Sequence, residues 1–171
     1  MATYRERMEI LFKNLRQTIG LGEDDRAVFI EWACERHIRL RQRDKRWIDR
    51  TQSNQDLPDC EKYFTAVCNA IKSCEGKDYY TGKPLNWQIT LEPKKESPDR
   101  EKQGVETAER QERVTFDHLN GRNLEDLQFA LCAGKTNDAK NDLTEDEFLE
   151  LCEAVYNYKK SKSGPSGPSG L

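Results

Sequence analysis

The sequence predicts an α+β protein, with an N-terminal helical unit, then a module of two strands and a helix with a long charged insertion, then a C-terminal helix. Apolar residues recur every three or four positions over much of residues 1–75, as in amphipathic helices. Short β-prone runs replace that pattern further along, and a capped helical pattern returns near residue 145. We therefore expect a helical unit over residues 1–75, a second module over 76–158 and a flexible tail over 159–171.

Composition and charge limit the classes of function. Charged residues make up 35% of the 171 positions and apolar residues another 35%, with a mean hydropathy of −0.97, so the core must be modest. The formal net charge of −3 argues against a protein that coats nucleic acid through bulk positive charge, although a local basic face is compatible with it. No apolar run approaches the length of a membrane span, and the N-terminus lacks the apolar core of a signal peptide. We expect a cytoplasmic protein with no membrane partner.

The six cysteines contain no Cys-x-x-Cys pair, which excludes a structural zinc site of the usual spacing. They lie at apolar positions of predicted helices and strands. We expect reduced, mostly buried thiols in an intracellular, reducing compartment.

Three helices are predicted in the first unit. The first covers residues 5–19 and ends at Gly20. The second opens on a run of acidic residues and extends from about 23 to 50, because negative charge is favoured at a helix N-terminus. The third follows Pro58 and ends near residue 75.

The distal half of the second helix carries arginines spaced three and four apart, at Arg36, Arg39, Arg43, Arg46 and Arg50. This spacing places them on one helix face, which nearly continues the apolar face of the proximal half. Either the helix bends, or its distal half leaves the core as a protruding basic arm. The arm is a candidate for phosphate contacts, to which Lys140 could add, and a solvated charged face is the competing interpretation.

A different pattern begins after residue 79. Residues 80–84, Tyr-Thr-Gly-Lys-Pro, have turn chemistry, and residues 85–91 alternate apolar and polar side chains as in a half-buried strand. Residues 92–113 are almost wholly charged or small and include two prolines. We expect a long exposed insertion there.

A short β-prone run at 114–116 leads into Asp117 and His118, and a second apolar run covers residues 127–132. Asn137 follows after a glycine. Thr144 and Glu147 then have the spacing of a capping box, which predicts a last helix over 145–158.

Asp117, His118 and Asn137 together have the chemistry of a metal-dependent phosphodiesterase. A histidine with a pKa near ~6.5 can accept a proton from the attacking water. One carboxylate oxygen and one amide oxygen can hold a hard divalent cation and leave positions open for phosphate and water. A helix packed across two strands could bring Asn137 opposite Asp117.

Residues 74–148 resemble the HNH, or ββα-metal, endonucleases (His-Me finger). The resemblance is carried by the Asp117-His118 pair, by the Asn-Asp-Ala-Lys element at 137–140 and by the turn at residues 80–85. An asparagine in place of the final histidine resembles the endonuclease VII-like variants. The resemblance implies a ββα-metal finger with His118 as general base. It also implies Asp117 and Asn137 as metal ligands, with Mg²⁺ as the first candidate and Mn²⁺, Ni²⁺ or Zn²⁺ as further ones.

Two features depart from the family pattern. The cysteine pairs that brace many members are absent, and the middle asparagine or histidine has two candidate counterparts, Asp126 and Asn123, whose expected role is loop bracing. The first functional hypothesis is a divalent-metal-dependent endonuclease acting on DNA and leaving 5′-phosphate ends. The alternative is a non-catalytic nucleic-acid-binding or scaffold protein that keeps the fold. The sequence leaves the oligomeric state open.

Overall fold

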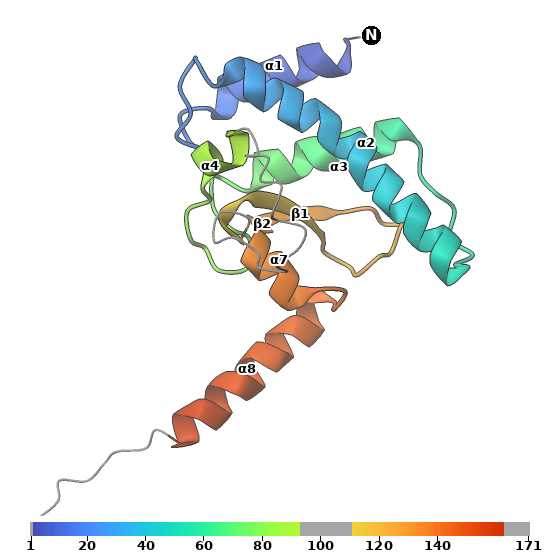
Figure 1. The fold of residues 1–171 in the computed structure, drawn as a ribbon, viewed down its shortest axis with the longest axis vertical. Helices are drawn as coiled ribbons and strands as arrows, with labels where there is room; N and C mark the ends of the chain where they lie inside the picture. The colour runs from blue at the N-terminus through green and yellow to red at the C-terminus, as the bar shows by residue number, and fades with distance from the viewer. Residues whose placement is uncertain (1, 93–110, 163–171) are drawn as a thin grey trace, which may run out of the picture.

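The computed structural model describes residues 2–92 and 111–162, which form an α+β fold. The elements in chain order are α1 (Tyr4–Leu15), α2 (Arg26–Thr51), α3 (Cys60–Ser73), α4 (Trp87–Leu91), β1 (Val114–His118), β2 (Phe129–Ala133), α7 (Gly134–Lys140) and α8 (Glu145–Lys162). Figure 1 shows α1, α2 and α3 gathered together, with the two strands beneath them and α8 pointing away from the rest. Most of the predicted insertion, residues 93–110, and residues 163–171 of the predicted tail lie outside the described residues.

The three N-terminal helices confirm the predicted helical unit. Thr3 and Glu6 form a reciprocal capping box at the start of α1, and the Asp59 carboxylate accepts the Lys62 amide proton at 2.8 Å at the start of α3. Each cap satisfies a backbone donor that has no partner inside its helix. The connections over 16–25 and 52–59 then return the chain so that α2 packs against both α1 and α3.

One hydrophobic core joins these helices to the strands. Trp32 of α2 stacks on Phe116 of β1 with ring centroids 5.7 Å apart, and Trp87 of α4 meets Trp32 edge-on at 5.4 Å. Phe129 of β2 lies 6.1 Å from both Phe116 and Tyr63 of α3. The strands are therefore fixed against α2 and α3, and this contact positions the ends of β1.

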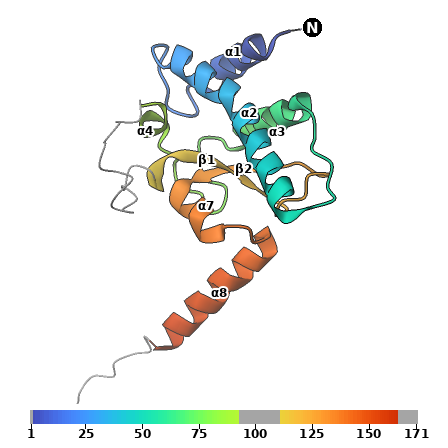
Figure 2. The same cartoon turned by 45° about the vertical axis from the view of Figure 1, so that its right-hand side comes forward.

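The expectation that the distal half of α2 leaves the core as an arm is wrong. Its buried stripe continues through Ala33, His37, Leu40 and Asp44, at spacings of four, three and four. Two of these residues, His37 and Asp44, are polar, so the spacing of apolar residues in the sequence does not reveal this buried stripe. Figure 2 shows the start of α2 beside α1 and its later turns passing at the level of the strands.

β1 and β2 form an antiparallel pair in which Asp117 lies opposite Ala130 and His118 opposite Phe129. The predicted strand at 85–91 is wrong, because Trp87–Leu91 is the short helix α4, capped by the Asn86 side chain. In a five-residue segment, the first and last side chains lie on the same face whether the segment is a strand or a helix. The alternating pattern therefore could not distinguish a strand from a helix here. The insertion accordingly precedes both paired strands and does not divide them.

α8 begins at the predicted capping box, where the Thr144 amide donates to the Glu147 carboxylate at 2.7 Å. It ends at Lys162, four residues beyond the predicted end.

The six cysteines are all free, as predicted, but only Cys68, Cys74 and Cys132 are buried. Burial was therefore overestimated, since Cys60 and Cys152 are exposed. Among residues 2–92 and 111–162, no helix has the length and apolarity required to cross a membrane.

Candidate functional site

A polar cavity of about 150 Å³ lies where α2, the β1–β2 connection and α7 meet. The residues that line it are Arg43, Asp117, His118, Gly121, Arg122, Asn137, Asp138, Asn141 and Asp142. All three candidate residues of the Asp-His…Asn pattern therefore border the same cavity.

Asp117 and His118 reach the cavity from the last two positions of β1. Consecutive side chains of a strand point to opposite faces, and each residue makes separate contacts here. Asp117 is directed toward Tyr80 and Lys140, whereas His118 is directed toward α2. Asn137 arrives from α7, which begins directly after β2, so the two strands and the short helix bring the three residues together.

Asp117 is buried, and its Oδ2 has one hydrogen-bond donor and one ion-pair partner. The Tyr80 hydroxyl donates at 2.6 Å and the Lys140 ammonium lies at 3.0 Å. Burial and the hydrogen bond to Asp117 both raise the pKa of Tyr80, which keeps its hydroxyl protonated as a donor.

Lys140 was expected on a phosphate-binding surface, and that expectation is wrong. Its side chain is fully buried, and its Nζ donates to the His118 carbonyl oxygen at 3.1 Å and forms an ion pair with Asp117. Lys140 therefore holds the end of β1 against α7, as a buried ammonium paired with a carboxylate.

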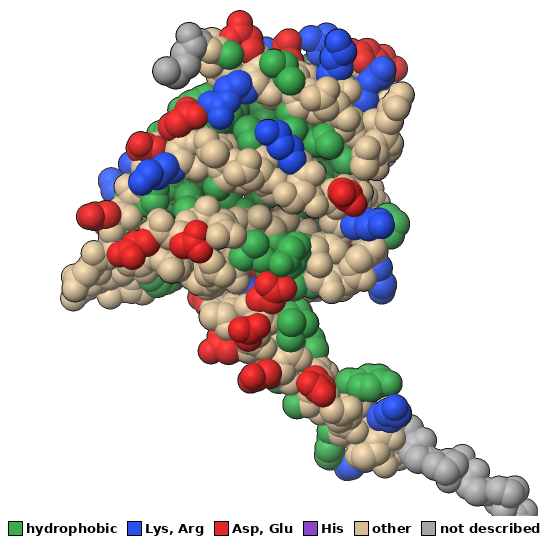
Figure 3. Space-filling model, turned by 180° about the vertical axis from the view of Figure 1, so that it is seen from behind, with side chains coloured by type: hydrophobic (Ala, Val, Ile, Leu, Met, Phe, Trp, Pro, Cys, Tyr) green, Lys and Arg blue, Asp and Glu red, His purple; other side chains and the backbone are tan. Residues whose placement is uncertain are grey.

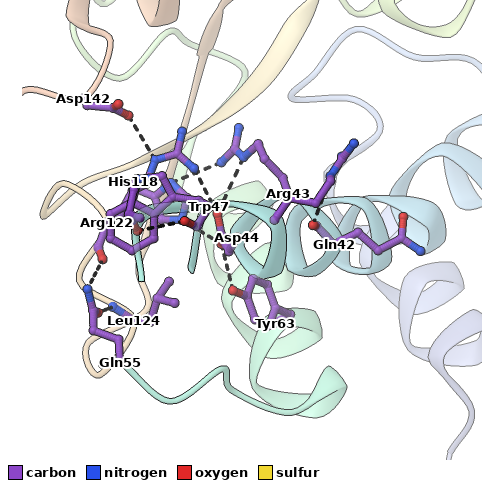
Figure 4. Close-up of polar contacts among 12 residues, drawn as sticks. Gln42, Arg43, Asp44, Trp47, Gln55, Tyr63, His118, Arg122, Leu124 and Asp142 are labelled. Atoms are coloured by element: carbon purple, nitrogen blue, oxygen red, sulfur yellow. Dashed lines mark hydrogen bonds and ion pairs between the residues drawn. The ribbon is translucent and has the colours of Figure 1, made fainter. Parts of the chain in front are cut away.

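His118 is held at both ring nitrogens (Figure 4). Nε2 lies 3.0 Å from Oδ2 of Asp44, and Nδ1 lies 3.1 Å from a terminal nitrogen of Arg43. A guanidinium can only donate, so Nδ1 must be the acceptor and Nε2 must carry the proton that is donated to Asp44. His118 is thereby fixed as a neutral ring whose lone pair points toward Arg43.

Asp44 is the residue of this candidate site that sequence reasoning missed. It is fully buried and accepts from the Tyr63 hydroxyl at 2.7 Å as well as from His118, and Arg122 Nη1 lies 3.4 Å from its second oxygen. Burial raises the pKa of Asp44, but the hydrogen bonds from His118 and Tyr63 and the Arg43 charge together bring it below its usual range. Its only sequence signal was its place on the buried stripe of α2.

Two arginines border the cavity. Arg122, from the β1–β2 connection, bridges Asp44 and Asp142, the latter at 3.0 Å from its Nε, and stacks over Trp47. Burial lowers the pKa of Arg43, which the neighbouring Asp44 charge partly offsets. The cavity thus combines carboxylates with two guanidinium groups, which are suited to binding phosphate.

The cavity also offers oxygen donors for a divalent cation. In the described part of the chain, Oδ1 of Asp117 and the side-chain oxygen of Asn137 have no hydrogen-bond partner, and both residues border the cavity. Carboxylate and amide oxygens are ligands that Mg²⁺ and Mn²⁺ accept. No three His, Cys, Asp or Glu side chains within 2–92 and 111–162 converge as a metal cluster. By their donor chemistry, the carboxylate of Asp117 and the amide of Asn137 fit a divalent cation.

The other predicted arginines are divided between two environments. Arg36 lies over the Trp32 ring, and burial lowers its pKa to about 10. Arg39, which pairs with Glu35, is exposed, as are Arg46 and Arg50. Of the five predicted arginines, Arg39, Arg46 and Arg50 remain available as an outer basic surface.

The two candidate bracing residues both lie in the β1–β2 connection. Asn123 accepts the Glu125 amide proton at 3.1 Å, and Asp126 accepts from Asn120 and Gln128, each at 2.8 Å. These contacts are local to the connection.

Comparison with known proteins finds no family model, no characterised protein and no solved structure that matches this chain.

Proposed function

We propose that this chain is a divalent-metal-dependent endonuclease that hydrolyses phosphodiester bonds in nucleic acid, most directly DNA. The observation that carries the proposal is one polar cavity that is bordered by a carboxylate, a neutral histidine, an amide and two arginines. Phosphodiester hydrolysis requires an activated water and compensation of charge on the phosphate and the leaving oxygen. The residues around the cavity can meet each requirement.

His118 is the general base in this proposal. Its lone pair is on Nδ1, while the Nε2 proton is donated to Asp44 at 3.0 Å. When Nδ1 takes a proton from water, the ring becomes positive, and the buried Asp44 carboxylate stabilises that charge. Asp44 is thus a positioning residue that fixes the tautomer and orientation of the base.

Arg43 and Arg122 are the phosphate-binding groups nearest the base. Arg43 donates to Nδ1 of His118 in this structure. A phosphate in the cavity competes for the same guanidinium, and drawing Arg43 toward it frees Nδ1 for water. A divalent cation on Asp117 and Asn137 would supply charge neutralisation at the phosphate and at the leaving oxygen.

The decisive experiment is a nicking assay on supercoiled plasmid with Mg²⁺ or Mn²⁺. We expect nicked and then linear DNA with wild-type protein, and a loss of about 100-fold or more in rate for His118→Ala, since general bases contribute about 10²- to 10⁴-fold. Asn137→Ala should lose activity similarly, whereas Asn69→Ala, an exposed amide on α3, should not. If wild-type protein cuts neither DNA nor RNA with any divalent metal, the enzyme hypothesis is rejected.

One observation favours the alternative, a nucleic-acid-binding or scaffold protein without catalysis. Both ring nitrogens of His118 are already paired within the protein, as expected of a purely structural ion network. This alternative predicts that the protein binds DNA but releases no product, and that His118→Ala changes stability alone.

A further inference from the structure

α8 leaves the body of the protein without burying any of its own residues. Its contacts with the rest of the described chain are at its start, where Tyr79 donates to Glu145 and Phe148 meets the Tyr80 ring. Figures 1 and 2 both show the helix extending away from the strands. At 18 residues, α8 is about 27 Å long.

One side of α8 is apolar along most of this length. Five large apolar side chains are each about half exposed or more: Leu149, Leu151, Val155, Tyr156 and Tyr158. Together with Phe148 and Cys152 they recur at three- and four-residue spacing, which places them on one half of the helix surface. An exposed apolar face of this continuity marks an interaction surface.

The charges on α8 are separated along its axis. Its first half carries five acidic residues and no basic one, whereas its last four residues include three lysines: Glu145, Asp146, Glu147, Glu150 and Glu153, then Lys159, Lys160 and Lys162. Figure 3 shows the acidic side chains on the half of α8 next to the body and a lysine near its far end. Two copies of the helix placed antiparallel bring opposite charges together, whereas parallel copies bring like charges together.

We propose that α8 binds α8 of a second copy of this chain, antiparallel, with the twofold axis close to Cys152. A twofold interface is self-complementary, so each residue meets its counterpart across the axis. Around residue 152, Phe148 faces Tyr156 of the second copy, and Glu145 faces Lys159. Figure 1 shows the body beyond the acidic end of α8, so in this antiparallel arrangement the two bodies lie at opposite ends of the helix pair. The inference is independent of the proposed enzymatic activity.

The polar side of α8 supports a protein partner in preference to a lipid surface. It carries most of the acidic residues of the helix, and amphipathic helices that lie on anionic membranes are basic on that side. A single helix pair is a small interface, so we expect a dimer with a Kd of about 1 to 100 μM.

Cysteine cross-linking tests the position of the axis. Cys152 is free and exposed, and near a twofold axis it lies close to its own copy. Mild oxidation of the full chain should give a disulfide-linked dimer that Cys152→Ser abolishes. Cys60→Ser, the matched control at the other exposed cysteine, should leave the dimer intact. A cross-link that persists in Cys152→Ser would place the contact elsewhere and overturn the inference.

Sedimentation of the unoxidised protein tests the interface and its direction. Val155→Asp should weaken the dimer at least tenfold, and Asn157→Asp on the opposite side should not. Both sites are on the exposed helix, so neither change disturbs the core. Glu145→Lys and Lys159→Glu should each weaken the dimer, and the double variant should recover it, because the pair is restored with its signs exchanged.

Three sedimentation results would also contradict the proposal. They are a wild-type chain that stays monomeric at several hundred micromolar, a dimer insensitive to Val155→Asp, and a charge-exchanged double variant weaker than either single variant. The last would indicate a parallel pair or a different occupant of the apolar face.

Discussion

Asp44→Asn changes one buried oxygen to an amide nitrogen and removes a charge that four groups share. The carboxylate accepts from Tyr63 and His118 on one oxygen and faces Arg122 on the other, with Arg43 Nε 3.7 Å away. The new amide nitrogen is itself a donor, and at either oxygen position it would face another donor: Tyr63 and His118 at one, Arg122 at the other. The placement beside Tyr63 and His118 requires Nε2 to lose its proton, and the proton on Nδ1 would then face the Arg43 guanidinium.

At least two charge-assisted hydrogen bonds are therefore lost, each worth about 1.5 to 3 kcal/mol. This agrees with the cost of about 3 to 5 kcal/mol for removing one partner of a buried ion pair. We expect the free energy of unfolding at neutral pH to fall by about 3 to 5 kcal/mol.

The stability difference between the wild type and Asp44→Asn should depend on pH. The folded-state pKa of Asp44 lies below its ordinary value of 3.8, so the folded protein binds this proton less readily than the unfolded chain. The stability that Asp44 contributes is then fully present above the unfolded-state pKa and is lost as pH falls through the folded-state pKa. The gap should be constant near neutrality and shrink below about pH 4.

Urea denaturation followed by tryptophan fluorescence, repeated from pH 7 down to acid, measures both quantities. Asp142→Asn is the matched control, because it removes an exposed partner of Arg122 and should cost less than about 1 kcal/mol. A loss below about 1 kcal/mol for Asp44→Asn, or a gap that persists unchanged in acid, would refute the buried-network argument.

Three further changes test neighbouring features. Lys140→Met leaves the carboxylate above it unpaired in a buried place and should cost about 3 to 5 kcal/mol in urea denaturation, whereas a surface lysine would cost almost nothing. Thr144→Ala removes the α8 capping box and should destabilise its first turn by about 1 kcal/mol, which amide hydrogen exchange there would detect; unchanged protection rejects it. Replacing Arg39, Arg46 and Arg50 together by glutamine should weaken DNA binding and reduce the slope of log affinity against log salt by about 2 to 3, measured by anisotropy titration; an unchanged slope excludes these contacts.

Helices and their starts were predictable because their signals are local. Thr144 and Glu147 are three residues apart, and the apolar spacing of α1 and α3 is visible within single windows of sequence. The same local logic failed at 85–91, where the segment is too short for a period of two to be told from one of 3.6.

The candidate residues Asp117, His118 and Asn137 could be chosen from sequence because their types and order match a recognisable chemistry, and the structure places them around one cavity. Their partners could not be chosen. Asp44 is 74 residues from His118 in sequence, and Arg122 is 78 from Asp44, so no local pattern links them. In sequence, Asp44 is one charge among many in an arginine-rich helix.

The sequence by itself determined the helices α1, α2, α3 and α8 and where most of them begin, and it supplied three side chains for the proposed phosphodiesterase site. Only the tertiary structure decided which charges are free and which are paired. Lys140, Arg43, Arg46 and Arg50 are all basic residues that look alike in the sequence. In the folded chain, Lys140 and Arg43 point inward against carboxylates, whereas Arg46 and Arg50 face solvent. The reason is physical: a residue's type sets its possible contacts, but burial and pairing depend on elements that are distant in sequence and adjacent only after folding.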